Sequence, residues 1–267
     1  MTTLMAIGGA ADFEEPVIFE EFIRRAGGAQ ARIVVLPQAS GLKTTGAEYA
    51  TALQGLGVKS KPVALEFRER HLADLKAHLG ALRRATGIFI AGGTQMRLTF
   101  LFGGTEFEQE LLAAFRRGAV VAGTSAGTAV MSKVMIAYGK GGATPREGLA
   151  RFSPGLGFTG KIIFDQHFRQ RDRLGRLAYA VSMHPGLLGV GVDENTCAIV
   201  EEDRRISVRG KNAVTIVDGR EVVSSNVAEV DGSRPVAVSG LRIHVLTEGC
   251  SFDMERRQAR IPGIRLG

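Results

Sequence analysis

Residues 119–131, with the sequence AVVAGTSAGTAVM, carry three structural signals in succession. The apolar run predicts a buried strand, the G-x-S-x-G segment predicts a tight turn, and the residues that follow begin a helix-like run. A turn this tight lifts Ser125 into a strained, exposed position, which small neighbours on both sides permit. We therefore predict that Ser125 is a nucleophile, that the helix N-terminus favours developing negative charge, and that the amide of Ala126 is an oxyanion donor.

The chain on the N-terminal side of this turn alternates between strand and helix patterns. This order predicts an α/β fold with a central, mostly parallel sheet and helices on both faces, in which ligands bind beyond the carboxyl ends of the strands. We expect strands at Leu4–Ile7, Ile33–Leu36, Lys61–Leu65, Gly87–Ala91 and Ala119–Ala122, and helices over Phe13–Ile23, Thr45–Leu56, His71–Leu82, Thr94–Phe102 and Phe107–Phe115.

The C-terminal part has a different pattern, with short apolar runs joined by turn residues. We expect an antiparallel extension here, a loop over Gly139–Pro145 and a loose arginine-rich tail that includes Arg256, Arg257, Arg260 and Arg265. The expected strands are Lys161–Phe164, Gly189–Val192, Ile206–Gly210, Ala213–Val217, Arg220–Val223 and Leu241–Thr247. No linker or repeat interrupts the sequence, so we expect a single domain over residues 1–267.

The composition excludes several classes of protein. The chain has 267 residues, 45% of them hydrophobic and 23% charged, as a globular protein does. Its net charge of +7 comes from dispersed basic residues and aromatic content is only 6%, so nucleic-acid binding is not expected. No apolar run approaches the ~20 residues of a membrane span. Two cysteines and an N-terminus without a signal-peptide pattern favour a cytoplasmic protein.

A nucleophilic serine needs a base and an acid that orients the base. Of the five histidines, His167 is the leading candidate because it directly follows an expected strand. The acid is Asp193 or Glu194, which stand at the end of another expected strand. Adjacent strand residues point in opposite directions, so only one of the two faces the site, and the sequence does not determine which. The order of residues in α/β-hydrolases would instead require His244 as the base and Asp193 as the acid.

Arginines cluster after His167. On a helix Arg169, Arg173 and Arg176 would share a face and Arg171 would point elsewhere, and guanidinium groups bind carboxylates bidentately. The cluster is either a carboxylate site or a solvated basic face. No glycine motif has the context of a nucleotide site, and Cys197 and Cys250 lack zinc-ligand spacing, so neither a cofactor nor a metal is expected.

Taken together, five segments resemble the cyanophycinases, within the wider group of aspartyl-specific serine peptidases that includes peptidase E. They occur in the family's order over roughly the first three-quarters of the chain, and the Asp-Gln-His-Phe sequence with the following arginines is the most specific. The segments are Ile7–Ala10, Ile90–Gln95, Gly123–Gly127, Asp165–Phe168 with Arg171, Arg173 and Arg176, and Gly189–Thr196.

The resemblance implies a fold similar to class I glutamine amidotransferases, no metal or cofactor, and a homodimer. Ser125 would match the nucleophile, His167 the base and Glu194 the acid, and Gly92 or Gly93 would supply a second oxyanion amide. The implied substrate is cyanophycin, polyaspartate that carries arginine on its side chains, cleaved to β-aspartyl-arginine. The matching substrate-pocket residues are Gln95, Asp165, Gln166, Arg171, Arg173 and Arg176, with Asp165 expected to attract a substrate arginine.

One position departs from the pattern: Thr94 stands where relatives more often have Asp or Asn, which bears on fine specificity. Two alternatives to a cyanophycinase remain open. The first is an aspartyl or isoaspartyl dipeptidase of the peptidase E type. The second is a non-catalytic binding relative, although such a protein would usually lose one of the three residues Ser125, His167 and Glu194.

Overall fold

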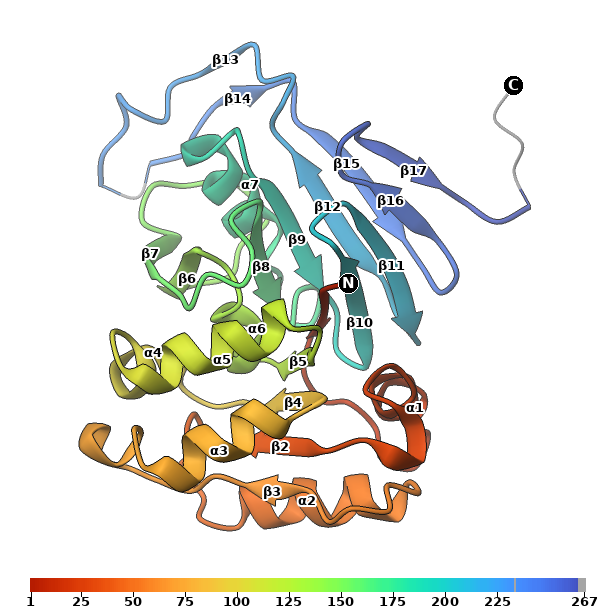
Figure 1. Cartoon of the computed structure of the whole chain (residues 1–267). Helices are drawn as coiled ribbons and strands as arrows, with labels where there is room; N and C mark the ends of the chain where they lie inside the picture. The colour runs from red at the N-terminus through yellow and green to blue at the C-terminus, as the bar shows by residue number, and fades with distance from the viewer. Residues whose placement is uncertain (233, 264–267) are drawn as a thin grey trace.

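The computed structural model describes residues 1–232 and 234–263 and is built around a nine-stranded sheet (Figure 1). Half of this sheet is parallel, as the alternating pattern predicts. Its strands lie in the order β1 (Thr3–Ile7), β5 (Val120–Thr124), β4 (Gly87–Ile90), β2 (Ile33–Leu36) and β3 (Val63–Ala64). Every residue of β1, β2, β4 and β5 is buried, because helices cover both faces.

The other half of the large sheet is antiparallel and is formed by later parts of the chain. It extends from β1 through β10 (Thr196–Glu201), β11 (Arg205–Gly210), β16 (Ser251–Asp253) and β17 (Gln258–Arg260). β1 therefore lies between a parallel neighbour, β5, and an antiparallel neighbour, β10. β1 thus contacts strands from both the N-terminal and the C-terminal part of the chain.

A second sheet has four strands in the order β15 (Arg242–Leu246), β12 (Val214–Asp218), β9 (Leu188–Val192) and β8 (Ile162–Gln166). β8 and β9 are parallel, whereas β12 is antiparallel to both of its neighbours. Val190 and Ile216 of this sheet share one apolar core with Val208 and Phe252 of the large sheet. The two sheets therefore pack together, and the ends of β1, β5 and β8 meet.

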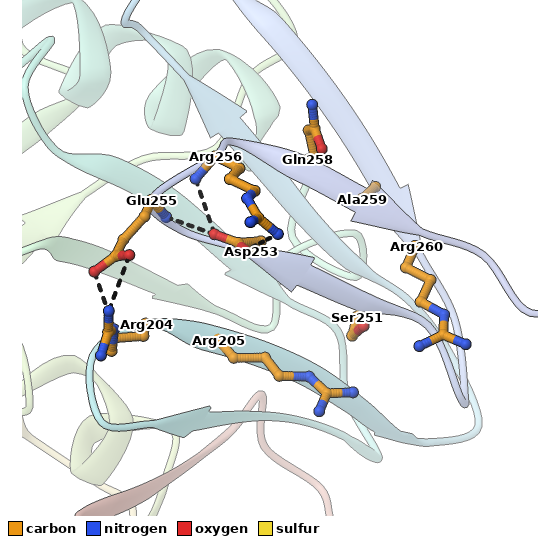
Figure 2. Close-up of a pocket in the computed structure, with 9 residues that line it drawn as sticks. All are labelled: Arg204, Arg205, Ser251, Asp253, Glu255, Arg256, Gln258, Ala259 and Arg260. Carbon is orange, nitrogen blue, oxygen red and sulfur yellow. Dashed lines mark hydrogen bonds and ion pairs between the residues drawn. The ribbon is translucent and has the colours of Figure 1, made fainter. Parts of the chain in front are cut away.

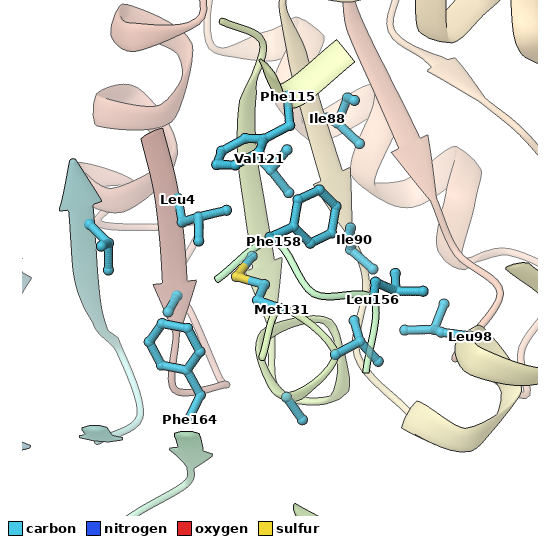
Figure 3. Close-up of a cluster of buried hydrophobic side chains, with 14 of the residues drawn as sticks. Leu4, Ile88, Ile90, Leu98, Phe115, Val121, Met131, Leu156, Phe158 and Phe164 are labelled. Carbon is cyan, nitrogen blue, oxygen red and sulfur yellow. The ribbon is translucent and has the colours of Figure 1, made fainter. Parts of the chain in front are cut away.

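Two apolar clusters hold the helices against the large sheet. On one face α1 (Val17–Arg25) and α2 (Thr45–Gly55) bury Phe19, Phe22 and Leu53 against β2 and β4. On the other face lie α3 (Lys76–Arg84), α4 (Gln95–Phe102) and α5 (Glu106–Arg116). Figure 3 shows this second cluster, in which Phe115 packs edge-on against Phe158 at 5.3 Å between ring centroids.

Short elements complete the fold around the end of β5. They are the four-residue helix α6 (Ala126–Ala129), the hairpin of β6 (Val134–Gly139) and β7 (Ala150–Pro154), the helix α7 (Leu174–Met183), and the short pair β13 (Ser224–Ser225) and β14 (Val238–Ser239). Two 3-10 turns occupy Gly28–Gln30 and Arg70–Leu72. None of the helices in the described residues has the length and hydropathy that a membrane span requires.

Several expected elements differ from the structure. Residues 220–223 form no strand: 220 and 221 lie in a turn, and the partner of β12 on that side is the later strand β15. The helix expected from His71 begins only at Lys76, after a 3-10 turn. The tail is not loose as far as Arg260, since Arg257 bonds Asp218 and β17 pairs with β16; Arg265 lies outside the described residues.

Candidate active site

The turn between β5 and α6 holds Ser125 in a strained conformation, with φ of 53° and ψ of −110°. Two glycines make the turn possible: a Cβ at Gly123 would lie 2.3 Å from the carbonyl oxygen of Gly127, and one at Gly127 would lie 2.2 Å from that of Ile90. The buried Thr128 hydroxyl is 2.7 Å from the carbonyl oxygen of Ile7 and 2.6 Å from that of Gly123. The strand-turn-helix geometry expected around Ser125 is therefore present.

His167 reaches Ser125 from the second sheet, directly after β8. Its backbone also has a positive φ, 49°, and its N–H donates to the carbonyl oxygen of Gly8 at 2.7 Å. The imidazole Nε2 is 2.8 Å from Ser125 Oγ, and Nδ1 is 2.6 Å from Glu194 Oε1. Because an ionised carboxylate only accepts, Nδ1 carries the proton and Nε2 is free to accept from the serine hydroxyl.

The structure distinguishes the two adjacent acids that the sequence leaves open. Glu194 faces His167, whereas the Asp193 carboxylate accepts from the backbone N–H groups of Arg169 at 3.0 Å and Ala213 at 3.3 Å. Burial raises the pKa of Asp193, which fits a carboxyl group enclosed by backbone. The alternative base, His244, lies on β15 with its ring against Phe252, at 5.0 Å between centroids. It is His167, not His244, that bonds Ser125.

The surroundings of His167 keep its imidazole neutral. Burial lowers the pKa of His167 below its ordinary value of 6.5, the hydrogen bond to Glu194 opposes this shift, and the positive charges of Arg171 and Arg173 add to it. A neutral imidazole is the form that accepts a proton. At neutral pH the site therefore combines a serine hydroxyl with a neutral imidazole that is able to accept its proton.

Ser125 opens into a cavity of about 490 Å³ whose wall is rich in cations and amides. Gln95 is fixed at its edge by donating from Nε2 to the carbonyl oxygen of Ala137 at 2.6 Å. Of the residues expected in the substrate pocket, Gln95, Gln166, Arg171, Arg173 and Arg176 line it, together with Gly93 and Thr94. Residues 136–139 of β6 also line it, which we did not predict; the apolar run that starts at Val134 was the available signal.

Asp165 does not line the cavity, so the expectation that it contacts a substrate arginine needs correction. Its side chain is fully buried on β8 and accepts from Arg176 Nε at 2.8 Å and from Arg173 Nη1 at 3.2 Å. Arg173 also donates to the carbonyl oxygen of Gln166. Asp165 therefore holds two of the cavity's cations in place from behind.

The helical arrangement expected of the arginines is also wrong. Residues 169–172 form turns and α7 begins only at Leu174, so Arg171, Arg173 and Arg176 reach the cavity and Arg169 does not. Burial lowers the pKa of Arg173 to about 10, which still leaves a cation at neutral pH. The cavity thus presents positive charge next to the serine, which suits a substrate with carboxylates.

Two backbone amides near Ser125 are available to a ligand. In the described part of the chain, neither the N–H of Gly93 nor that of Ala126 donates a hydrogen bond. Gly93 has a φ of 138°, and a Cβ there would lie 2.1 Å from the carbonyl oxygen of Ala39. Among the described residues, no group of three or more His, Cys, Asp or Glu side chains is arranged to hold a metal ion.

An α/β sheet with a strained serine at a strand-to-helix turn and a histidine bonded to that serine is the arrangement typical of serine hydrolases. Sequence comparison identifies the family: residues 4–208 match peptidase family S51, and the chain belongs to it. It is a peptidase of the cyanophycinase and peptidase E type.

Curated relatives match nearly the whole chain. A cyanophycinase of Synechococcus elongatus is 39% identical over 260 residues, which cover 96% of this chain and 80% of that protein. A cyanophycinase of Trichormus variabilis is 38% identical over 259 residues, covering 96% and 87%. That of Geminocystis herdmanii is 37% identical over 260 residues, covering 96% and 95%.

Solved structures support the fold at much lower identity. A peptidase from an acI-B1 Actinobacterium superimposes with a TM-score of 0.68 at 17% identity, covering 95% of this chain and 97% of that one. A putative peptidase E from Listeria monocytogenes gives a TM-score of 0.55 at 13% identity, covering 79% and 100%. Together they support a mixed α/β peptidase fold with a large central sheet.

Proposed function

We propose that this protein hydrolyses cyanophycin to β-aspartyl-arginine dipeptides, as a single peptidase domain with a class I glutamine amidotransferase-like fold. The observation that carries the proposal is the hydrogen-bonded series Ser125–His167–Glu194, which opens into a cavity lined by Arg171, Arg173 and Arg176. The cyanophycinase relatives, which match 96% of the chain, support the substrate class. A homodimer and a cytoplasmic location stay predictions.

In the first half of the reaction, Ser125 Oγ attacks the carbonyl carbon of an aspartyl backbone peptide bond while His167 Nε2 takes the hydroxyl proton. Glu194 stabilises the imidazolium through Nδ1. The bond from the carbonyl carbon to the leaving nitrogen then breaks, His167 returns the proton to that nitrogen, and the acyl group stays on Ser125 as an ester.

In the second half, a water molecule gives its proton to His167 and attacks the ester carbonyl. The bond to Ser125 Oγ breaks, and His167 returns the proton to the serine. The negative oxygen of each tetrahedral intermediate is stabilised by the amides of Gly93 and Ala126, an interaction that contributes ~3–4 kcal/mol per donor where it has been measured. Neither amide has another partner in the part of the chain described here.

The cavity chemistry matches the free carboxylate in the repeat unit of this polymer. Each unit has a free carboxylate on its arginine, and Arg171, Arg173 and Arg176 offer guanidinium groups for it. Two of these cations are oriented by the buried Asp165, so little side-chain entropy is lost when they bind. Gln95 and Gln166 offer polar contacts to the amides of the unit.

The test is incubation of the purified protein with insoluble cyanophycin, with products identified by mass spectrometry. We expect the wild type to release β-aspartyl-arginine. The Ser125→Ala variant should lose turnover by about 10⁴-fold or more and still bind the polymer. Ser60→Ala, an exposed serine before β3, is the matched control and should act as wild type.

Equal turnover by Ser125→Ala would remove Ser125 as the nucleophile. Hydrolysis of small aspartyl peptides without release of dipeptides from the polymer would overturn cyanophycin as the substrate and select a dipeptidase of the peptidase E type.

A further inference from the structure

A second cavity, of about 350 Å³, lies on the other side of α4 from the catalytic cavity. Its wall contains three cationic side chains and no acidic one. The lining residues are Gln38, Gly41, Lys43, Arg68, Arg97, Phe100 and Leu101. No role in the mechanism above uses this cavity.

The cations of this second cavity are not neutralised by the protein. Arg68 donates to the carbonyl oxygens of Ser40 at 2.5 Å and Leu42 at 3.2 Å, and Arg97 only weakly to that of Ala39, at 3.4 Å. Over residues 1–232 and 234–263, Lys43, Arg68 and Arg97 form no ion pair with an acid. A cavity with unpaired cations attracts an anionic ligand.

The floor of the second cavity has an unsatisfied hydrogen-bond acceptor. Gln38 is only 1% exposed, and its Nε2 donates to the carbonyl oxygen of Leu65 at 2.6 Å. Its Oε1 is buried and has no partner in the described residues. A buried polar atom without a partner is costly, so a ligand that donates an N–H here gains affinity. At the rim, Phe100 is 66% exposed and offers an apolar surface.

Another groove, over β16 and β17, differs from this cavity because acidic side chains line it together with the cations (Figure 2). Two acids lie on its surface and pair with two of its four arginines, Arg204 with Glu255 at 3.0 Å and Arg256 with Asp253 at 3.9 Å, whereas none of the described acids lines the cavity at α4. Its strands β16 and β17 also lie four and five strands away from β5, which leads into Ser125. The cavity at α4 is therefore the stronger candidate for a ligand.

The second cavity and the catalytic cavity share a wall. The N–H of Thr94 donates to the carbonyl oxygen of Ala39 at 2.9 Å, and Gly93 packs against the same carbonyl. Gln95 and Arg97 are two residues apart on α4, yet the first lines the catalytic cavity and the second lines the cationic one. The helix between them has a diameter of ~10 Å, so a polymer that reaches both cavities must span at least that distance, which takes an extended chain at ~3.3 Å per residue about three residues or more.

We propose that this cavity is a second polymer subsite, which binds the arginyl carboxylate and an amide N–H of a repeat unit at least about three units from the one at Ser125. The inference rests on the proposed function. Lys43, Arg68 and Arg97 bind the carboxylate, and Gln38 Oε1 accepts from the N–H. The subsite favours long chains over short ones, because only a long chain fills both cavities at once.

The experiment compares a two-unit oligomer with one of about eight units, which exceeds the separation of the cavities. The subsite variant is Lys43→Gln with Arg97→Gln. Arg68 stays unchanged, because it also holds the loop carbonyls of Ser40 and Leu42. We expect the ratio of KM for the long oligomer to KM for the short one to rise about tenfold, as expected for lost charge-assisted hydrogen bonds.

The matched control is Lys59→Gln with Arg116→Gln, which removes the same charges from exposed positions before β3 and at the end of α5. An unchanged KM ratio in the subsite variant, or the same rise in the control, would overturn the inference and leave the proposed function standing. If the wild type cleaves neither oligomer, the proposed function fails by itself.

A direct binding measurement tests the proposed subsite without requiring turnover. In the Ser125→Ala background, a polyaspartate peptide is titrated by calorimetry against the protein with and without the subsite substitutions. About tenfold weaker binding after substitution supports an anionic subsite, and equal binding overturns it.

Discussion

The α-carbon of Gly9 lies directly against the imidazole ring of His167. A methyl group at Gly9 would lie 2.2 Å from His167 Cε1 and 2.7 Å from both ring nitrogens. Next to it, the carbonyl oxygen of Gly8 accepts the backbone N–H of His167. The end of β1 thus shapes the space for the ring that β8 presents to Ser125, and a hydrogen atom is the largest side chain that fits.

We predict that Gly9→Ala displaces the His167 ring and lowers kcat by about 10²-fold or more, since misplacement by ~1 Å has effects of this size. The variant should still fold, because the ring can shift toward the cavity. Steady-state kinetics with a thermal unfolding curve would check this.

Gly27→Ala is the control for backbone strain at Gly9. Gly27 has a φ of 114°, close to the 113° of Gly9, but a Cβ there would meet only ordinary contacts at 3.9 Å. This control should lose stability and keep kcat. Equal kcat values in the two variants would contradict the steric role of Gly9.

We predict that Asp165→Asn leaves the cations of Arg173 and Arg176 without a counter-charge and raises KM. Loss of one partner of a buried ion pair costs about 3–5 kcal/mol in the free energy of unfolding. Denaturant unfolding and KM should both respond, because the two arginines also line the cavity.

Asp218→Asn is the control that separates a loss of stability from an effect on the cavity. Asp218 is 3% exposed and bonds Arg257 at 2.9 Å, away from the catalytic cavity. We expect it to lower the free energy of unfolding with KM unchanged. If Asp165→Asn behaved in the same way, Asp165 would have no positioning role for the cavity.

The acidic limb of the pH profile, in which kcat/KM falls with falling pH, should reflect the protonation of His167. Since burial lowers its pKa, we expect kcat/KM to fall, as the pH falls, only below the ordinary value of 6.5. Arg171→Gln removes a charge that lowers this pKa, so the limb should move to higher pH. Arg169→Gln, a neighbouring cation outside the cavity, should leave the limb in place. A limb that stays unmoved in Arg171→Gln would contradict this charge effect.

Thr128 should stabilise the serine turn through its hydroxyl. Thr128→Val keeps the shape but loses the donor to the carbonyl oxygens of Ile7 and Gly123, and should cost about 1–3 kcal/mol in unfolding free energy. Thr128→Ser keeps the hydroxyl and should cost less. Chemical denaturation of both variants would check this, and equal losses would indicate that packing, not the hydrogen bonds, matters.

Local patterns in the chain were enough for the parallel half of the sheet and for the turn at Ser125. Apolar runs such as Ile33–Leu36, closed by proline or glycine, predicted buried strands, and the structure confirms this one. The same patterns misplaced the arginines after His167, because periodicity assumed a helix where the chain makes turns. They also missed β6, whose residues 136–139 line the cavity.

The sequence by itself therefore determined where the strands end and where the tight turn lies. Apolar runs indicate burial, and glycine permits the backbone conformation that the G-x-S-x-G turn requires. Long-range contact decided the rest. Whether Asp193 or Glu194 faces His167 depends on which backbone amides reach Asp193, and one of these comes from Ala213. That Asp165 is buried behind Arg173 and Arg176 depends on how the second sheet packs. The first relationship joins residues far apart in the chain and the second depends on the packing of β8, so only the packed structure determines them.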